Sequence, residues 1–213
     1  MIARFYRKKV RLLKRWARSN RLFVGAIVAV LIIGTLAYTS YMQNKRLAVN
    51  PATYTSLLQL IATVESKGNY NAYFGNASNT SIDFTKMSIK EVMQWQADFV
   101  RQGSASSAVG RYQIVDTTLA GLVRQLHLST AEPFGQATQD KLAIALLERR
   151  GAERYVNGEL TRDQFAANLA MEWAALPKVI GDNPNDSYYA SDGLNRSLVS
   201  VDDVRNAIEP ISP

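Results

Sequence analysis

The sequence predicts a mainly helical α+β domain that follows one transmembrane helix. Three observations lead to this prediction. Apolar residues recur at helical spacing through most of residues 53–213, a stretch rich in turn residues interrupts them at 70–85, and residues 22–44 hold no charged side chain. We expect a basic cytoplasmic tail at 1–21, a transmembrane helix at 22–44, a short linker at 45–52 and a single folded domain at 53–213.

The amino-terminal tail carries the basic excess of the chain, which has 25 Lys plus Arg against 18 Asp plus Glu. Residues 1–21 contain nine basic residues and no acid, and Lys45 and Arg46 add two more. Residues 47–213 therefore keep 14 basic residues and all 18 acids, a formal charge of −4. Because the folded part is mildly acidic, nucleic acid is not the expected partner.

The uncharged run at 22–44 is long enough to cross a membrane. About 20 apolar residues span a hydrocarbon layer of roughly 30 Å, and Thr35 is the one polar side chain within residues 22–37. The excess of basic residues before the run places the amino terminus in the cytoplasm and the domain across the membrane. A cleavable signal peptide is the alternative, but the 21-residue basic region is long for one, and no small-residue cleavage site follows Ala37.

The first helix of the folded domain is predicted from Leu57, Leu60, Ile61 and Val64, which share one helical face, with Gly68 as its stop. A small β-hairpin lobe is predicted at 70–85, where Tyr, Asn, Gly and Thr are frequent. Apolar spacing predicts further helices at 89–99, 119–126, 137–150, 161–175 and 194–208, with a polar connection at 177–193.

The composition excludes several kinds of site. The chain has no Cys, so a disulfide, a zinc–thiolate centre and a thiol nucleophile are excluded. The single histidine, His127, is too few for a multi-histidine metal site. We therefore expect neither a metal ion nor a cofactor.

Glu65 is the strongest catalytic candidate because it ends an apolar helix, immediately before Ser66, Lys67 and Gly68. The negative end of the helix dipole disfavours an ionised carboxylate there, and partial burial would act in the same direction. Both effects would raise the pKa of Glu65 toward a value suited to donating a proton at neutral pH. From this segment alone, a surface glutamate near a helix end is the alternative interpretation.

Three further segments add aromatic and amide side chains: Tyr-Asn-Ala-Tyr-Phe-Gly-Asn at 70–76, Ala-Val-Gly-Arg-Tyr-Gln at 108–113, and Glu-Trp-Ala-Ala-Leu-Pro at 172–177. With the Glu-Ser pair at 65–66, the last two segments make the chain resemble the endolysins related to that of bacteriophage lambda. These endolysins are lytic transglycosylases of the lysozyme-like superfamily. The resemblance covers roughly residues 54–195 and depends on the three motifs occurring in this order.

The resemblance implies a lysozyme-like fold and peptidoglycan glycan strands as the substrate. It implies that Glu65 protonates the glycosidic oxygen between N-acetylmuramic acid and N-acetylglucosamine. The same residue would then act as a base while the muramyl 6-hydroxyl attacks the anomeric carbon, which gives a 1,6-anhydro end. It also implies that Tyr112 and Gln113 line the groove beside the scissile bond, and that Ser66 can polarise Glu65 or the substrate.

The other candidates for sugar contact are Tyr73, Arg111, Trp173 and Tyr188. Tyr73 lies in the segment whose aromatic faces suit stacking on sugar rings, and Arg111 belongs to the 108–113 motif. Trp173 occupies a helical position where packing in the core is the alternative. Tyr188 lies in the polar connection, where a side chain is well placed for ligand contact.

A hydrolase would instead need a second carboxylate, about 5–5.5 Å away for retention of configuration or 6.5–9.5 Å for inversion. Asp83, 18 residues after Glu65, is the best candidate for a muramidase mechanism, followed by Glu172 and Asp116. The alternative for Asp83 is a turn or helix-cap residue, which aspartate favours. Spacing along the sequence does not decide between the two mechanisms.

Together these features predict a membrane-anchored enzyme that cleaves peptidoglycan on the periplasmic side of a bacterial inner membrane. A tethered enzyme of this kind would suit local opening of the wall for a secretion, conjugation or phage assembly. The alternative is a non-enzymatic, bitopic scaffold whose lysozyme-like domain only binds glycan.

Overall fold

The structure is a computed structural model that describes residues 32–35, 51–193 and 195–211. The chain divides into two compact units, Met1–Val49 and Asn50–Pro213. The predicted tail, most of the predicted transmembrane helix and most of the linker lie outside the described residues. In the part that is described, no helix has both the length and the apolar character needed to cross a membrane.

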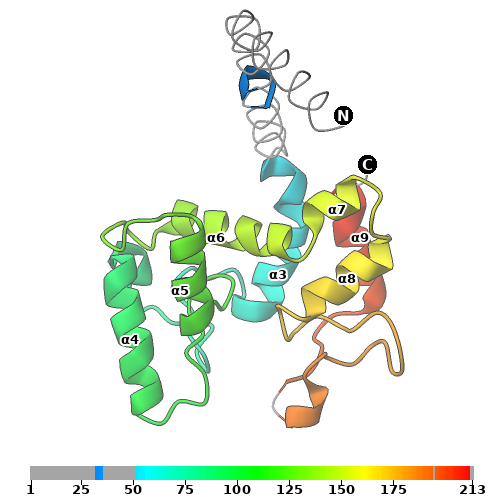
Figure 1. Ribbon diagram of the computed structural model, residues 1–213. Coiled ribbons are helices and arrows are strands. Elements are labelled where there is room, and N and C mark those ends of the chain that lie inside the picture. The colour runs from blue at the N-terminus through cyan, green and yellow to red at the C-terminus, as the bar shows by residue number, and fades with distance from the viewer. Residues whose placement is uncertain (1–31, 36–50, 194, 212–213) are drawn as a thin grey trace, which may run out of the picture. The chain divides into compact units, whose positions relative to one another are not determined.

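The second unit is mainly helical, as predicted (Figure 1). Its α-helices are α3 (Thr55–Ser66), α4 (Ile89–Arg101), α5 (Asp116–Gln125), α6 (Gln136–Arg149), α7 (Ala152–Val156), α8 (Arg162–Ala170) and α9 (Val201–Ile208). Short 3-10 turns are η1 (Pro51–Tyr54), η2 (Phe84–Lys86), η3 (Ala190–Asp192) and η4 (Glu209–Ile211).

Two predicted helices are shorter than the apolar spacing indicated, and one helix was missed. Helix α8 ends at Ala170 rather than near 175. Helix α9 begins only after Ser200, whose side chain accepts a hydrogen bond from the Asp203 N–H in a capping box. The missed helix α7 follows Gly151, which has a φ of 102°; its five residues are too few to show an apolar period.

The prediction of a β-hairpin at 70–85 is wrong. Among the described residues the structure contains isolated antiparallel bridges and no strand. The bridges next to this segment pair Tyr73 with Asn76, Tyr73 with Val109, and Val109 with Ile114. The segment is therefore a compact loop that contacts the 108–114 motif.

Side-chain amides explain why the loop forms no strands. The Asn79 amide donates to the carbonyl oxygens of Asn71, at 2.6 Å, and Ile82, at 2.8 Å. The Asn69 amide donates to the carbonyls of Ala77, at 3.0 Å, and Asn79, at 2.9 Å. Because these amides satisfy backbone groups that a strand partner would otherwise bind, the chain folds around them.

Helix α3 connects two groups of helices (Figure 1). Helices α4 and α5 contact each other on one side, while α7, α8 and α9 form the other group. Helix α6 contacts both α5 and α7, and α3 packs against α9. The carboxyl end of α3, where Glu65 lies, is thereby held between the two groups.

An aromatic cluster of one buried and three half-buried rings lies beside α4. The rings of Trp95 and Phe99 are stacked with centroids 4.6 Å apart, and Phe84 meets Trp95 edge-on at 4.7 Å. Tyr73 joins the cluster 5.4 Å from Trp95. These contacts fix the loop at 70–85 against α4 by burying aromatic surface.

Gln139 on α6 holds three separate segments together. This side chain is buried, and its Nε2 donates to the carbonyls of Tyr70 and Phe134, each at 3.0 Å. Its Oε1 accepts from the Arg111 N–H at 2.8 Å. Gly110 makes this approach possible, since it has a φ of +78° and a Cβ there would lie 2.4 Å from the Gln139 Oε1.

We predict that Gly110→Ala destabilises the domain more than Gly158→Ala. Gly158 also has a positive φ, +74°, but a Cβ there would meet no atom within 4 Å. The control should therefore lose about 1 kcal/mol from backbone strain alone. Gly110→Ala should lose roughly 1–3 kcal/mol more, because it also displaces Gln139. Urea unfolding of both variants measures the difference; equal losses would show that the Gln139 contact contributes nothing.

Candidate active site

Glu65 lies in the last turn of α3 because the helix closes directly after it. Lys67 and Gly68 adopt left-handed backbone conformations, with φ values of 55° and 80°. Their N–H groups donate back to the carbonyls of Thr63, at 3.1 Å, and Ala62, at 2.9 Å. The helix therefore ends in two left-handed residues, with Gly68 just beyond its last residue as predicted, and Glu65 lies at its carboxyl end.

The carboxyl group of Glu65 is partly buried and has a single hydrogen-bond donor in the described structure. The Ala175 N–H donates to Glu65 Oε1 at 3.3 Å. Burial raises the pKa of Glu65 from 4.5 to about 7, while the Ala175 N–H opposes that rise. Near neutral pH both the acid and the base form of the group are therefore populated.

Ser66, the residue after Glu65, lies in the interior of the domain and not at its surface. Its side chain is fully buried. Its Oγ lies 2.7 Å from the Arg111 carbonyl oxygen and 3.0 Å from that of Ala62. Ser66 therefore ties the end of α3 to the 108–113 motif, and contact between Ser66 and substrate stays a prediction.

The 108–113 motif is fixed from two more directions. Tyr112 is buried, and its hydroxyl donates to Asp140 Oδ1 at 2.7 Å. Trp173, also buried, donates its indole N–H to the Tyr112 carbonyl at 3.2 Å, as the packing alternative for this residue predicts. Gln113 is partly exposed at a φ of 48°, and its Nε2 donates to the Gly110 carbonyl at 2.9 Å. Gln113 thus supplies the one amide side chain of the motif, and this residue is not fully buried.

The two tyrosine candidates differ in their surroundings. Tyr73 is half-buried in the aromatic cluster and accepts a hydrogen bond from the Asn76 amide at 3.1 Å. Tyr188 is 49% exposed and meets Tyr189 edge-on at 5.2 Å. The Tyr189 hydroxyl donates to the Met171 carbonyl at 2.8 Å, which anchors the pair. Tyr188 therefore presents an aromatic face to solvent.

The candidate second carboxylates are engaged elsewhere. Asp83 precedes η2, forms an ion pair with Lys86 at 3.0 Å and accepts from the Thr85 hydroxyl at 2.5 Å. The Thr85 hydroxyl and Lys86 lower the pKa of Asp83. These contacts are those expected of the turn-residue alternative.

Glu172 and Asp116 also have structural partners. The Glu172 carboxylate is almost fully buried between Arg149, at 2.9 Å, and Arg150, at 2.8 Å. Asp116 begins α5 and accepts from the Ser107 hydroxyl at 3.0 Å. Within the described ranges, no three His, Asp or Glu side chains are grouped to hold a metal ion.

Arg111 lines a pocket of about 300 Å³ between α3 and α6. Its Nη2 donates to Gln59 Oε1 at 2.7 Å, and its guanidinium carbon lies 4.8 Å from the centre of the Tyr70 ring. Tyr70 and Asp140 were not predicted as site residues. Nothing local distinguishes them, because they meet only when α6 packs against the loop after α3.

A family model described as Endolysin matches residues 55–192. The match includes Glu65, the 108–113 motif and Trp173, and it spans well over half of the chain. A search of curated proteins and a search of solved structures gave no match. The chain therefore belongs to the endolysin family, whose enzymes degrade the peptidoglycan of the cell wall.

Proposed function

We propose that the chain is a lytic transglycosylase that cuts the β-1,4 bond between N-acetylmuramic acid and N-acetylglucosamine. The observation that carries this proposal is the carboxyl group of Glu65, which burial brings to a pKa of about 7 at the end of α3. A group with this pKa can give up a proton and take one back at neutral pH without a large energetic cost in either direction.

Both chemical steps then use the one carboxyl group. Protonated Glu65 gives its proton to the glycosidic oxygen as the bond from that oxygen to the muramyl anomeric carbon breaks. The resulting carboxylate takes the proton of the muramyl 6-hydroxyl as its oxygen bonds to the anomeric carbon. The products are a free N-acetylglucosamine hydroxyl and a 1,6-anhydro end, and Glu65 is protonated again with no water consumed.

The Ala175 N–H supports the second state of this cycle. It donates to Glu65 Oε1 at 3.3 Å and lowers the pKa, so it favours the carboxylate. Burial favours the neutral acid. The opposition of these two effects keeps both protonation states accessible, as a residue that acts first as acid and then as base requires.

The surroundings of the other carboxylates favour this mechanism over a muramidase that uses Asp83. In the described residues, burial and the Ala175 N–H account for the shift of the Glu65 pKa, and no neighbouring carboxylate contributes to it. Asp83 is bound to Lys86 and Thr85. A hydrolase would need an unengaged carboxylate close enough to act on the same sugar.

We further propose that residues 22–44 anchor the enzyme in the bacterial inner membrane, with the domain on the periplasmic side. The support is the absence of charge in this run and the nine basic residues before it. Anchoring would confine cleavage to the wall near one site, as a secretion, conjugation or phage assembly requires. The linker of about eight residues keeps the domain near the bilayer.

Replacing Glu65 by Gln should reduce the release of muropeptides from purified peptidoglycan by about 10³-fold, since the amide cannot donate the proton. Asp83→Asn is the matched control and should retain activity within a few fold. Mass spectrometry of the wild-type products should show each cleaved end short of one water.

Two outcomes would contradict this assignment. Unchanged activity of Glu65→Gln would show that Glu65 is not the proton donor, whereas a wild-type protein that binds glycan without cleaving it would favour the non-enzymatic scaffold. Loss of activity in Asp83→Asn, together with reducing ends in the products, would establish the muramidase mechanism.

The pH dependence should show one descending limb. The free enzyme must hold a proton on Glu65, so kcat/KM should fall above a pH of about 7. A mechanism that also needs ionised Asp83 would add an ascending limb at low pH, near the lowered pKa of that residue. A profile of kcat/KM from about pH 2 to pH 9 separates the two, because the limb of Asp83 would lie below the ordinary aspartate value. A descending limb centred near pH 4.5 would show that burial does not shift Glu65.

A reporter fused to the carboxyl terminus tests the anchor. Alkaline phosphatase, which is active only outside the cytoplasm, should be active in this fusion and should sediment with membranes. Reversing the charge of the basic residues in 1–21 should lower that activity, because the charge bias sets the orientation. Phosphatase activity in the soluble fraction alone would indicate a cleaved signal peptide.

A further inference from the structure

The pocket beside Arg111 is separate from the carboxyl group of Glu65. It lies between the first turns of α3 and the middle of α6, and Glu65 is not among its lining residues. Thr55, Gln59, Tyr70, Arg111, Tyr112 and Asp140 supply its polar lining. Its volume of about 300 Å³ is at the small end of the range for pockets that bind small molecules.

Arg111 brings a positive charge to this pocket that the described residues do not neutralise. No carboxylate oxygen in the described ranges lies within 4.0 Å of its guanidinium nitrogens. Its Nε is buried and has no hydrogen-bond acceptor among those residues. The guanidinium lies over the Tyr70 ring, at 4.8 Å, and near the Tyr112 ring, at 5.7 Å, which leaves its charge partly desolvated. A carboxylate ligand would supply the negative charge, and the hydrogen-bond acceptor for Nε, that Arg111 lacks among the described residues.

Asp140 brings a negative charge to the same pocket. Its carboxylate accepts from the Tyr70 hydroxyl, 3.0 Å from both oxygens, and from the Tyr112 hydroxyl at 2.7 Å. Burial and the bond to Asp140 raise the pKa of both tyrosines, which therefore stay neutral donors. No cation of the described residues pairs with Asp140, and its oxygens can accept further hydrogen bonds.

Two opposite charges in one small pocket favour a ligand that carries both. A simple anion would be attracted by Arg111 and repelled by Asp140, and a simple cation would meet the reverse. A zwitterionic amino-acid centre, with an ammonium and a carboxylate on one carbon, satisfies both residues together. The face of Tyr70 suits the aliphatic chain attached to such a centre.

We propose that this pocket binds the free zwitterionic end of a peptidoglycan stem peptide, the ammonium and carboxylate on the side chain of meso-diaminopimelate. The carboxylate would face Arg111 and the ammonium Asp140. This inference rests on the proposed function, because in an intact glycan strand the stem peptide would meet the pocket when its muramyl sugar lies at Glu65.

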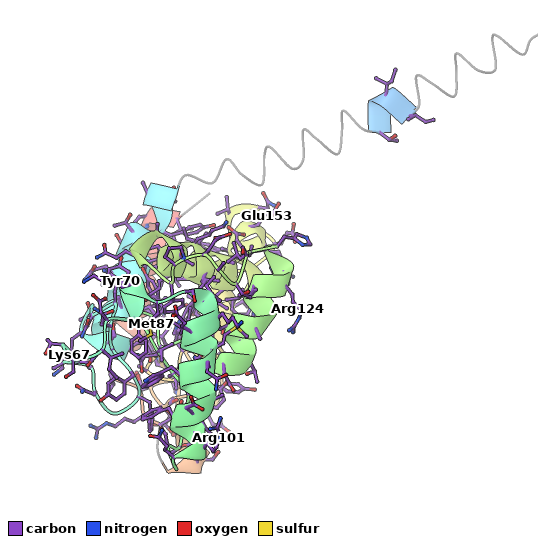
Figure 2. All side chains as sticks on the ribbon, turned by 90° about the vertical axis from the view of Figure 1, so that its left-hand side faces the viewer. Lys67, Tyr70, Met87, Arg101, Arg124 and Glu153 are labelled. Carbon is purple, nitrogen blue, oxygen red and sulfur yellow. The ribbon has the colours of Figure 1, made fainter. Side chains whose placement is uncertain are left out.

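The distances allow this arrangement. Gln59 precedes Glu65 by six residues of α3, or about 9 Å along the helix axis. The diamino acid is the third residue of the stem, and three extended residues cover about 10 Å. Figure 2 shows Tyr70 and Lys67 along the same edge of the domain, with Tyr70 nearer the start of α3.

The proposal has a consequence for which strands are cut. Cross-linking converts the side-chain ammonium of the diamino acid into an amide, which removes the positive charge that Asp140 would bind. The pocket would therefore favour stem peptides that are not cross-linked. The enzyme would act first where the wall is newly made or already opened.

Titration calorimetry of the full-length protein with the tripeptide L-Ala–γ-D-Glu–meso-diaminopimelate tests the proposal. We expect saturable binding that weakens by at least about tenfold when the side-chain amine is acetylated or the side-chain carboxylate is amidated. The tripeptide with L-lysine in third place, which keeps the ammonium but lacks that carboxylate, should also bind at least about tenfold more weakly. Because these comparisons all use the wild-type protein, they do not depend on the folding of any variant.

Variants then locate the site. Arg111→Met and Asp140→Asn should each weaken binding at least about tenfold, while Arg124→Met, which removes an exposed cation of α5, should not change it. Equal affinity for the modified and unmodified peptides, or no binding at all, overturns the inference. If the protein cleaves glycan but does not bind the tripeptide, the pocket inference fails and the transglycosylase proposal stands. If it binds the tripeptide but cleavage does not depend on Glu65, only the transglycosylase proposal fails.

Discussion

The hydrogen bond from the Ser66 hydroxyl to the Arg111 carbonyl, 2.7 Å long, is the contact on which the rest of the site depends. It joins the last turn of α3 to the loop that carries both Gln113 and Arg111. Gln139 binds the N–H of Arg111, and Trp173 binds the carbonyl of Tyr112. With its backbone held by three buried side chains from different elements, this loop has one position relative to Glu65.

Desolvation is the main cause of the raised pKa of Glu65, and polar neighbours contribute little to it. A carboxyl group surrounded by many donors would be ionised at neutral pH, and one with none would stay protonated. Among the residues that the structure describes, Glu65 has one donor, the Ala175 N–H, and burial raises its pKa to about 7 against this donor. The segment Ala-Ala-Leu-Pro at 174–177 therefore acts on Glu65 through a backbone N–H group and not through its side chains.

Local features of this chain could be predicted from the sequence, and long-range ones could not. The end of α3 follows from Gly68, and the burial of Glu65 was predictable because an apolar helix carries it into the interior. The conformation of the loop at 70–85 could not be predicted, because the side-chain amides of Asn69 and Asn79 donate hydrogen bonds that replace strand pairing. Secondary-structure propensities do not describe such hydrogen bonds. Asp140 and Gln139 were missed because their partners Tyr70, Arg111 and Tyr112 lie 28 to 70 residues away in the chain.

The absence of a charged partner for Glu65 among the described residues also determines how the enzyme responds to dissolved salt. An acid whose proton affinity depends on an ion pair changes strength when salt screens that pair. Glu65 owes its pKa to burial and to one backbone dipole, both of which are short-ranged. Its acidity should consequently hold across wide changes in osmolarity and ionic strength, whereas a carboxylate pair would titrate differently in each medium.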